Sequence, residues 1–368
     1  MNKNKALISH LFNHFSMHPA RIIIMLEIIL SFIKIGNVRQ HKIAQGTKIK
    51  AKTSSIIRRI QRFFASEYLC PQKASKFIFS LFNWEEKISF TLDRTNWKFG
   101  KIDINFLVIG GIYNNYSIPL CWILLPHQGN SQTACRINLI EMLLLIVPLN
   151  RIKFLLADRE FIGIEWFRYL SERGVPFCIR MKENMLAIDT RQGGKIKLKR
   201  LFRHLSIGQS RELQQVVSGT MLRIFGTRIA TGELLILAVS GNDDLLDAIA
   251  LYSKRWTIET MFKAFKSSGF NFEDTHQQNL ERLYKMMILL TIAYAWAIKI
   301  GEIKNDIEPI KVKIHGRLEF SLFSYGFRAI QTILLKGAKF QHKLFCLLVK
   351  ITLNQAFSRN EAEVTVVY

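Results

Sequence analysis

The sequence predicts an α/β fold with a mixed β-sheet and helices on both of its faces. A helical N-terminal segment precedes the sheet, and an all-β insertion interrupts it. Three observations predict this. Apolar residues recur at helical spacing up to about residue 85, and the period changes to that of strands from Lys87. Between residues 185 and 241, glycines separate short β-like runs. Hydrophobic residues make up 49% of the 368 positions, enough for a sizeable core.

The N-terminal segment is expected to contain two short helices around a turn, the second of them basic. An apolar helix over Ala20–Ile35 is stopped by Gly36, and a short helix over Val38–Gly46 follows. Next comes the basic stretch Thr47–Phe64, for which Ser54 and Ser55 are the candidate N-caps. Its candidate DNA-binding residues are Arg58, Arg59 and Arg62. A helix-turn-helix-like DNA module and an ordinary solvated helical face explain this stretch equally well.

The central region alternates strands and helices. The expected strands are Lys87–Thr95, Phe106–Tyr113, Ile118–Leu125, Lys153–Ala157 and Pro176–Met181, and the expected helices are Cys135–Val147 and Ile164–Arg173. Three strands, then helix, strand, helix and strand, is the order of a ribonuclease-H-like fold. A long helix is expected from about Asp243 to Ser268, and a second, apolar helix over Leu280–Ile300.

These elements suggest four parts along the chain. They are a helical DNA-binding segment (1–85), a ribonuclease-H-like catalytic domain (86–184 and 242–300), a β-rich insertion (185–241) and a C-terminal region (301–368).

Net charge points to a polyanionic partner. Lysine and arginine number 52 against 28 acidic residues, a formal charge of +24. Each phosphate that a cation neutralises releases condensed counterions, so a polyanion is the expected partner. The alternative is a generally basic surface that only aids solubility.

A membrane partner is not expected. The apolar runs Ile22–Ile33 and Met286–Ile298 are shorter than the about 20 residues that a spanning helix needs. The N-terminus lacks a cleavage pattern of small residues, and the five scattered cysteines show no metal-ligand spacing, which fits a reducing cytoplasm.

Two aspartates follow apolar strand residues. Asp93 lies within or at the end of the first strand, and Asp158 directly follows Phe154–Ala157. A lone aspartate in such a place is more often a helix cap or a turn residue. Here the two strands would be neighbours in the sheet, which favours a shared site. Phosphodiester chemistry uses two Mg²⁺ ions roughly 4 Å apart, and Mg²⁺ takes carboxylate oxygens.

The third carboxylate is expected on the long helix. Tyr252, Arg255, Glu259 and Lys266 fall within roughly 60° of one another at about 100° per residue. Glu259 would reach the metals while the cations hold phosphates. The alternative is a solvated face with an i,i+4 ion pair between Arg255 and Glu259.

These residues resemble the DDE transposases of the insertion-sequence-four type. The spacing Y-x2-R-x3-E-x6-K matches the Y-R-E-K signature of that family, while Leu92–Trp97 and Leu156–Phe161 look like its two aspartate motifs. The β-rich stretch lies where the family carries an insertion. Ser321–Gly326 and Arg58–Phe63 resemble family patterns more weakly.

The resemblance implies a cut-and-paste enzyme. Asp93, Asp158 and Glu259 would bind two Mg²⁺ ions, with Mn²⁺ able to substitute. Tyr252, Arg255 and Lys266 would contact phosphates near the scissile bond and stabilise a DNA hairpin. The partners would be the element ends and target DNA, with a homodimer in the synaptic complex. A bacterial cytoplasmic location, on the nucleoid when bound to DNA, follows from the same resemblance.

Two alternatives stay open at this point. One is a catalytically silent relative that only grips DNA, and the intact carboxylate set argues against it. The other is a structure-specific nuclease of the same fold, which would hydrolyse DNA without joining it. Only the reaction products distinguish the second alternative.

Overall fold

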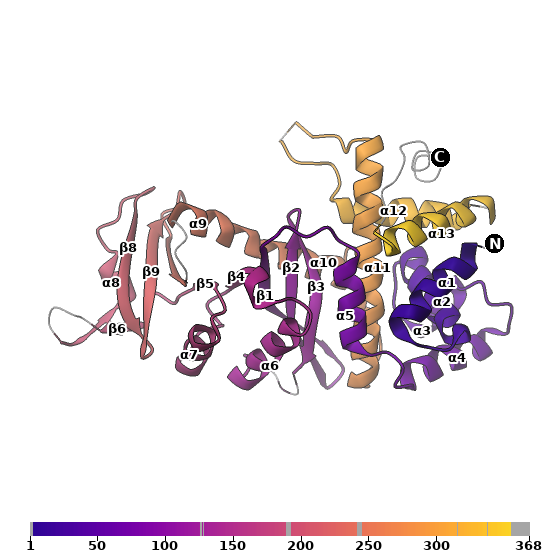
Figure 1. The fold of residues 1–368 in the computed structure, drawn as a ribbon, viewed down its shortest axis with the longest axis horizontal. Helices are drawn as coiled ribbons and strands as arrows, with labels where there is room; N and C mark the ends of the chain where they lie inside the picture. The colour runs from indigo at the N-terminus through magenta and orange to yellow at the C-terminus, as the bar shows by residue number, and fades with distance from the viewer. Residues whose placement is uncertain are drawn as a thin grey trace. The chain divides into compact units, whose positions relative to one another are not determined.

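The computed structural model describes residues 3–125, 127, 129–188, 193–240, 245–314, 316–336 and 338–354. The chain divides into two compact units (Figure 1). A helical unit takes residues 1–83, 97–104 and 261–368, and an α/β unit takes residues 84–96 and 105–260. Residues 261–300 thus group with the helical unit, whereas the sequence pattern groups them with the sheet. The difference arises because the apolar residues of both chain ends share one helical core.

The strands of the described chain form one ten-stranded sheet, in the order β3-β2-β1-β4-β5-β10-β9-β8-β6-β7. The strands are β1 (Ile88–Phe99), β2 (Ile102–Tyr113), β3 (Tyr116–Leu124), β4 (Ile152–Ala157), β5 (Phe177–Arg180), β6 (Leu186–Ile188), β7 (Lys195–Lys197), β8 (Ser210–Val217), β9 (Thr220–Arg228) and β10 (Leu234–Val239). β1, β4 and β5 are parallel, whereas β5, β10, β9 and β8 pair antiparallel. The predicted mixed sheet is confirmed, as is the turn at Asn114 and Asn115, both at positive φ.

Residues 185–241 are not a separate β body. β8, β9 and β10 extend the same sheet through the pairing of β10 with β5. The short helix α8 (Leu198–Leu201) also lies in this stretch, so its elements are not all strands. The glycine-punctuated pattern predicts strands here, but it does not show which existing edge those strands join.

Helices cover both faces of the sheet. Phe177 packs on Phe167 of α7 (Ile164–Arg173), with ring centroids 5.7 Å apart. The next residue, Cys178, faces the other way into a cluster with Tyr252 of α9 (Leu245–Ser253). Successive strand residues point to opposite faces, so α7 and α9 lie on opposite sides. α6 (Thr133–Leu144) packs on β3 and beside α7 (Figure 1).

The helical unit gathers elements from both parts of the chain. Its helices are α1 (Lys3–Phe15), α2 (Pro19–Ile35), α3 (Gln40–Gly46), α4 (Thr53–Ala65), α5 (Pro71–Ser80), η3 (Phe272–Asp274), α11 (Leu280–Ile307), α12 (Leu322–Leu335) and α13 (Ala338–Thr352). α11 packs against α2, α5 and α12, and α13 packs against α1. The predicted stop at Gly36 is confirmed by its left-handed conformation. The predicted caps Ser54 and Ser55 are wrong, because α4 begins earlier and its N-cap is Lys52.

Two glycines bring α11 and α12 into contact. A Cβ on Gly326 would lie 1.8 Å from the carbonyl oxygen of Ala297, and one on Gly301 would lie 2.0 Å from that of Leu322. No side chain fits at either position, so the two backbones touch directly.

α11 is long and apolar enough to cross a membrane, as is the bent pair 6–15 and 19–35 taken together. α11 ends at Ile307, seven residues beyond the end at Ile300 that the sequence predicts. In the structure, 89% of the apolar window of α11 is buried, as is typical of a core helix.

Candidate active site

The two predicted aspartates lie side by side where β4 ends against the middle of β1. β1 and β4 pair in register up to Leu92 and Ala157, and Asp93 and Asp158 are the next residues. Parallel neighbours stand about 4.8 Å apart in the pairing direction. The predicted adjacency of these two strands is confirmed.

Arg180 of β5 lies next to Asp158 in the direction across the strands. Ala157 pairs with Ile179 of β5, so Arg180 is the next residue after Asp158 across the sheet. Sequence reasoning missed Arg180, although it follows the apolar run Phe177–Ile179 as Asp158 follows its own strand. Residues two apart on a strand share a face, and Leu156 and Cys178 both contact Tyr252. Asp158 and Arg180 therefore belong to the face that α9 covers.

The two aspartates are held in the same way. Asp93 Oδ1 accepts the backbone N–H of Arg94 at 2.7 Å, and Asp158 Oδ1 accepts that of Arg159 at 2.7 Å. Each bond fixes one carboxylate oxygen against its own backbone. The second oxygen is left to face other partners.

Glu160 supports this edge without belonging to the predicted metal set. Arg94 donates from Nε and Nη2 to its two carboxylate oxygens, each at 3.2 Å, and both side chains are less than a quarter exposed. The backbone carbonyl of Glu160 also accepts from the guanidinium of Arg136, which is 4% exposed and bonded to Ser131 as well. These contacts tie the loop after Asp158 to β1 and to α6.

The predicted continuous helix through the third carboxylate is wrong. α9 ends at Ser253, a 3₁₀ turn covers Lys254–Trp256, and α10 (Thr257–Lys266) follows. The predicted start at Asp243 lies outside the described residues. The 3₁₀ turn changes the winding to three residues per turn. The guanidinium carbon of Arg255 still lies 5.9 Å from the ring centroid of Tyr252, and Arg255 Nη2 lies 2.9 Å from Glu259 Oε1, so these three predicted residues stay together.

Tyr252 is buried rather than presented at the surface. It is 6% exposed and packs with Phe154, Leu156 and Cys178. Burial raises the pKa of its hydroxyl, which has no hydrogen-bond partner among the described residues. Its contact with DNA phosphate stays a prediction.

Arg255 joins two of the three predicted carboxylates. Its Nη2 donates to Glu259 Oε1 at 2.9 Å, and its Nη1 donates to Asp93 Oδ2 at 3.4 Å. The side chain of Arg255 is only 6% exposed, against 17% for Asp93 and 40% for Glu259. The i,i+4 ion pair expected from the sequence is therefore present, but the same guanidinium also reaches the first strand.

The electrostatics of Asp93 differ from those of a surface carboxylate. Burial raises its pKa to about 6; the N–H of Arg94 and the charge of Arg255 oppose the rise, while Glu160 and Glu259 add to it. Burial outweighs the ion pair because Arg255 divides its charge between two carboxylates and lies 3.4 Å from this one.

The donors suit a hard divalent cation. Carboxylate oxygens are what Mg²⁺ prefers, and Arg255 already acts as a stand-in cation between Asp93 and Glu259. Within the described residues, no group of three or more histidine, cysteine, aspartate or glutamate side chains converges closely enough to hold a metal ion. The structure thus places Asp93 beside Asp158 and links Asp93 to Glu259 through Arg255, but it does not bring the three carboxylates together around one point.

Lys266 belongs to the helical unit. It pairs with Glu273 at 2.9 Å and lies over the ring of Trp97, 5.7 Å from the centroid.

The N-terminal arginines are exposed on one side of α4. Arg58, Arg59 and Arg62 face outward, whereas Ile56 and Ile60 are buried beneath them. Arg59 and Arg62 also border a hollow with Arg21 of α2, whose guanidinium stacks 3.5 Å over Tyr68. The sequence pattern missed Arg21, because nothing local distinguishes it from any other basic residue at a helix start.

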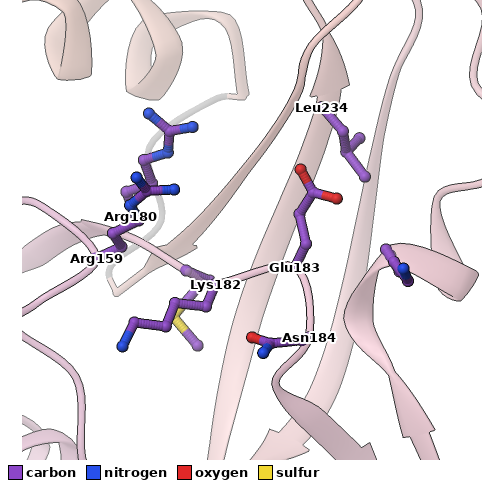
Figure 2. Close-up of a pocket in the computed structure, with 8 residues that line it drawn as sticks. Arg159, Arg180, Lys182, Glu183, Asn184 and Leu234 are labelled. Carbon is purple, nitrogen blue, oxygen red and sulfur yellow. The ribbon is translucent and has the colours of Figure 1, made fainter.

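A cationic hollow lies beside Arg180 and Arg159, the residue that follows Asp158 (Figure 2). Its lining residues are Arg159, Arg180, Met181, Lys182, Glu183, Asn184, Lys199 and Leu234. Arg159 and Arg180 lie next to each other in Figure 2. Arg180 is also paired with Glu233. Four cations against one lining carboxylate make an anion the suitable occupant.

Comparison with known proteins agrees with part of this picture. Residues 120–296 match the family model for the transposase DDE domain. That range contains Asp158 and Glu259 and begins after Asp93. No curated protein matches the sequence. A piggyBac transposase synaptic complex with hairpin DNA is similar in structure, with a TM-score of 0.48 and 11% identity over 95% of this chain and 76% of that chain. This structural likeness is too weak to carry an argument about chemistry.

Proposed function

We propose that this chain is a transposase that cuts the ends of a DNA element and joins them to target DNA. One observation carries the proposal: Asp93 and Asp158 follow register-paired residues on adjacent parallel strands, and Arg255 links Asp93 to Glu259. The match of residues 120–296 to the transposase DDE domain supports it. The sheet order with β1, β4 and β5 parallel also supports a ribonuclease-H-like core.

Asp93, Asp158 and Glu259 are the residues that would hold magnesium or manganese, as one or two ions. Bound there, the ions would supply activation of the attacking oxygen and stabilisation of charge on the leaving oxygen. Asp93 and Asp158 keep their orientation because each is fixed by the N–H of the following residue. The bidentate contact between Arg94 and Glu160 holds β1 to the loop after Asp158.

The cationic side chains would position DNA. The hollow is lined by Arg159, Arg180, Lys182 and Lys199, which would donate hydrogen bonds to the phosphate oxygens of the DNA backbone. Trp256 is 60% exposed and lies against Arg255, so its ring is available to stack on a base. In the helical unit, the outward arginines of α4 would bind the phosphates of duplex DNA.

In the cut-and-paste route that we propose, a nick frees a 3′-hydroxyl at the element end. That hydroxyl attacks the opposite strand and leaves a hairpin, which is reopened before the 3′-ends join target DNA. Two ends must be brought together, so the reaction would run in at least a dimer. The location would be the bacterial cytoplasm, where the DNA is.

Incubation with labelled element-end DNA and Mg²⁺ tests the proposal, with wild type compared with Asp158→Asn and Glu259→Gln. The matched controls are Asp247→Asn and Glu165→Gln, which alter exposed carboxylates of α9 and α7. We expect hairpin and joined products from wild type and both controls, and none from the two site variants. Cleavage that persists in either site variant would refute the ligand assignment. Hydrolysis without joining would indicate a nuclease, and binding without cleavage a silent relative.

A further inference from the structure

We propose that Arg255 is an internal cation that holds Asp93 and Glu259, and that a divalent ion and Arg255 compete for the same carboxylate oxygens. The displaced guanidinium then becomes available to a DNA phosphate. This inference rests on the proposed function, because it takes Asp93 and Glu259 as ligands of the ion.

The contacts show which oxygens are contested. Arg255 holds Glu259 Oε1 at 2.9 Å and Asp93 Oδ2 at 3.4 Å. Asp93 Oδ1 is already occupied by the N–H of Arg94. Oδ2 is therefore the oxygen that Asp93 would offer to an ion, and it is the one that faces Arg255.

Burial distinguishes this pair from a surface ion pair. Surface pairs are screened and contribute little. The side chain of Arg255 is only 6% exposed and that of Asp93 17%, so this pair is largely buried, whereas Glu259 is 40% exposed. The Nε of Arg255 is buried and has no hydrogen-bond partner among the described residues. A buried guanidinium needs its carboxylate partners, because leaving the buried charge unpaired would be costly. The unsatisfied Nε–H adds a free-energy cost to this position.

Competition lowers the apparent affinity of the ion. An ion that binds only the open form has its affinity reduced by the fraction of molecules that are open. If Arg255 closes the site in about nine molecules of ten, the apparent dissociation constant rises about tenfold.

The position of Arg255 also suits its release. It lies in the 3₁₀ turn between α9 and α10, with its guanidinium 4.8 Å from the ring centroid of the exposed Trp256. A guanidinium binds phosphate oxygens well. A DNA phosphate that binds Arg255 would free the oxygens of Asp93 and Glu259 for the ion. DNA and the ion would therefore each raise the affinity of the protein for the other.

Manganese binding to the full chain tests this, measured by titration calorimetry and by electron paramagnetic resonance of unbound Mn²⁺. The variants are Arg255→Gln, Arg255→Lys and Asp93→Asn. The matched control is Lys254→Gln, which removes an exposed positive charge from the same turn. Each protein is titrated with and without a short mixed-sequence duplex.

We expect Arg255→Gln to bind Mn²⁺ about tenfold more tightly than wild type, and Lys254→Gln to match wild type. Arg255→Lys should fall between them, because one ammonium cannot bridge both carboxylates as a guanidinium does; it also serves if the glutamine variant fails to fold. The duplex should tighten Mn²⁺ binding in wild type and have little effect in Arg255→Gln.

An Arg255→Gln affinity equal to or weaker than that of wild type would overturn the inference, as would an equal gain in Lys254→Gln. If Arg255→Gln does not tighten Mn²⁺ binding while Asp93→Asn loses it, the metal site is supported and only the role of Arg255 is refuted. If wild type binds no Mn²⁺, or Asp93→Asn binds it as tightly as wild type, both the inference and the proposed metal site fail.

Discussion

Asp93 and Asp158 occupy equivalent positions on neighbouring parallel strands, each one residue beyond the paired Leu92 and Ala157. The pairing register places the two carboxylates together, and no loop is needed to bring them there. A site built on two strands in register is rigid where its chemistry requires it.

Because the two aspartates form one unit, their substitutions should not add. We expect Asp93→Asn and Asp158→Asn each to lower strand cleavage by roughly a thousandfold, and the double variant to be little worse than either. Single-turnover cleavage of labelled DNA measures this. Additive losses would mean that the residues act independently.

The raised pKa of Asp93 predicts how stability depends on pH. The folded chain holds its proton more tightly than the unfolded chain does, because the pKa rises from 3.8 to about 6. The stability from the neutral form is thus fully present below about pH 4 and is lost as pH rises through 6. Asp93→Asn should therefore gain about 2 kcal/mol relative to wild type between pH 4 and pH 7.

Urea unfolding in EDTA measures that difference, with Asp247→Asn as the exposed control. The control should show the same pH dependence as wild type. If Asp93→Asn also follows wild type across this range, Asp93 does not titrate near pH 6.

The contact between Arg94 and Glu160 should appear as energetic coupling. Both side chains are less than a quarter exposed, so removing one leaves the other charge poorly solvated. In a double-mutant cycle of Arg94→Met and Glu160→Gln, we expect a coupling free energy of about 1 to 2 kcal/mol by urea unfolding. A value near zero would mean that the pair does not fasten the loop after Asp158 to β1.

The close approach of α11 and α12 predicts a severe effect of a single methyl group. Gly326→Ala should lower the free energy of unfolding by about 3 kcal/mol or more, because its Cβ would meet the backbone of Ala297. Gly194→Ala is the control, since a Cβ there meets nothing within 4 Å. Thermal unfolding compares the two. Equal midpoints would show that the helices can separate at no cost.

The exposed arginines of α4 should contribute to DNA binding through phosphates. Replacement of Arg58, Arg59 and Arg62 by glutamine should weaken binding to any duplex and reduce the slope of log K against log salt by about 2 to 3. Fluorescence anisotropy over a salt series measures this. An unchanged slope would support the alternative of a solvated face.

Local patterns were sufficient for the strands and for the aspartates. Apolar runs that end in a charged residue locate Asp93 and Asp158, and the same pattern would have located Arg180. The break at Lys254–Trp256 was not predictable in this way, because apolar residues continue at helical spacing on both sides of it. A single 3₁₀ turn interrupts the α-helix without any change in residue composition that a sequence pattern would detect.

The pairing of strands and helices that lie far apart in the sequence was also not predictable. The sequence predicts strands over residues 185–241 but not that β10 joins β5. Nor does it show that α11, α12 and α13 complete a core with α1, α2 and α5. Both depend on which apolar surfaces meet, and the local period carries no information on that. The caps failed for a simpler reason, since Lys52, Thr53 and Ser54 are consecutive polar residues, and each of them can begin a helix.

The shared helical core also determines the order in which the chain can fold during synthesis. The first helices leave the ribosome well before α11, against which α2 and α5 pack. Their apolar faces stay uncovered while residues 84–260 emerge, and those residues belong mostly to the other unit. Domains fold as units as they are made, so the α/β unit can be complete while the helical unit still waits. A transcript truncated after residue 260 would therefore yield Asp93 and Asp158 on a folded sheet, attached to helices whose apolar faces stay exposed and are open to aggregation or proteolysis.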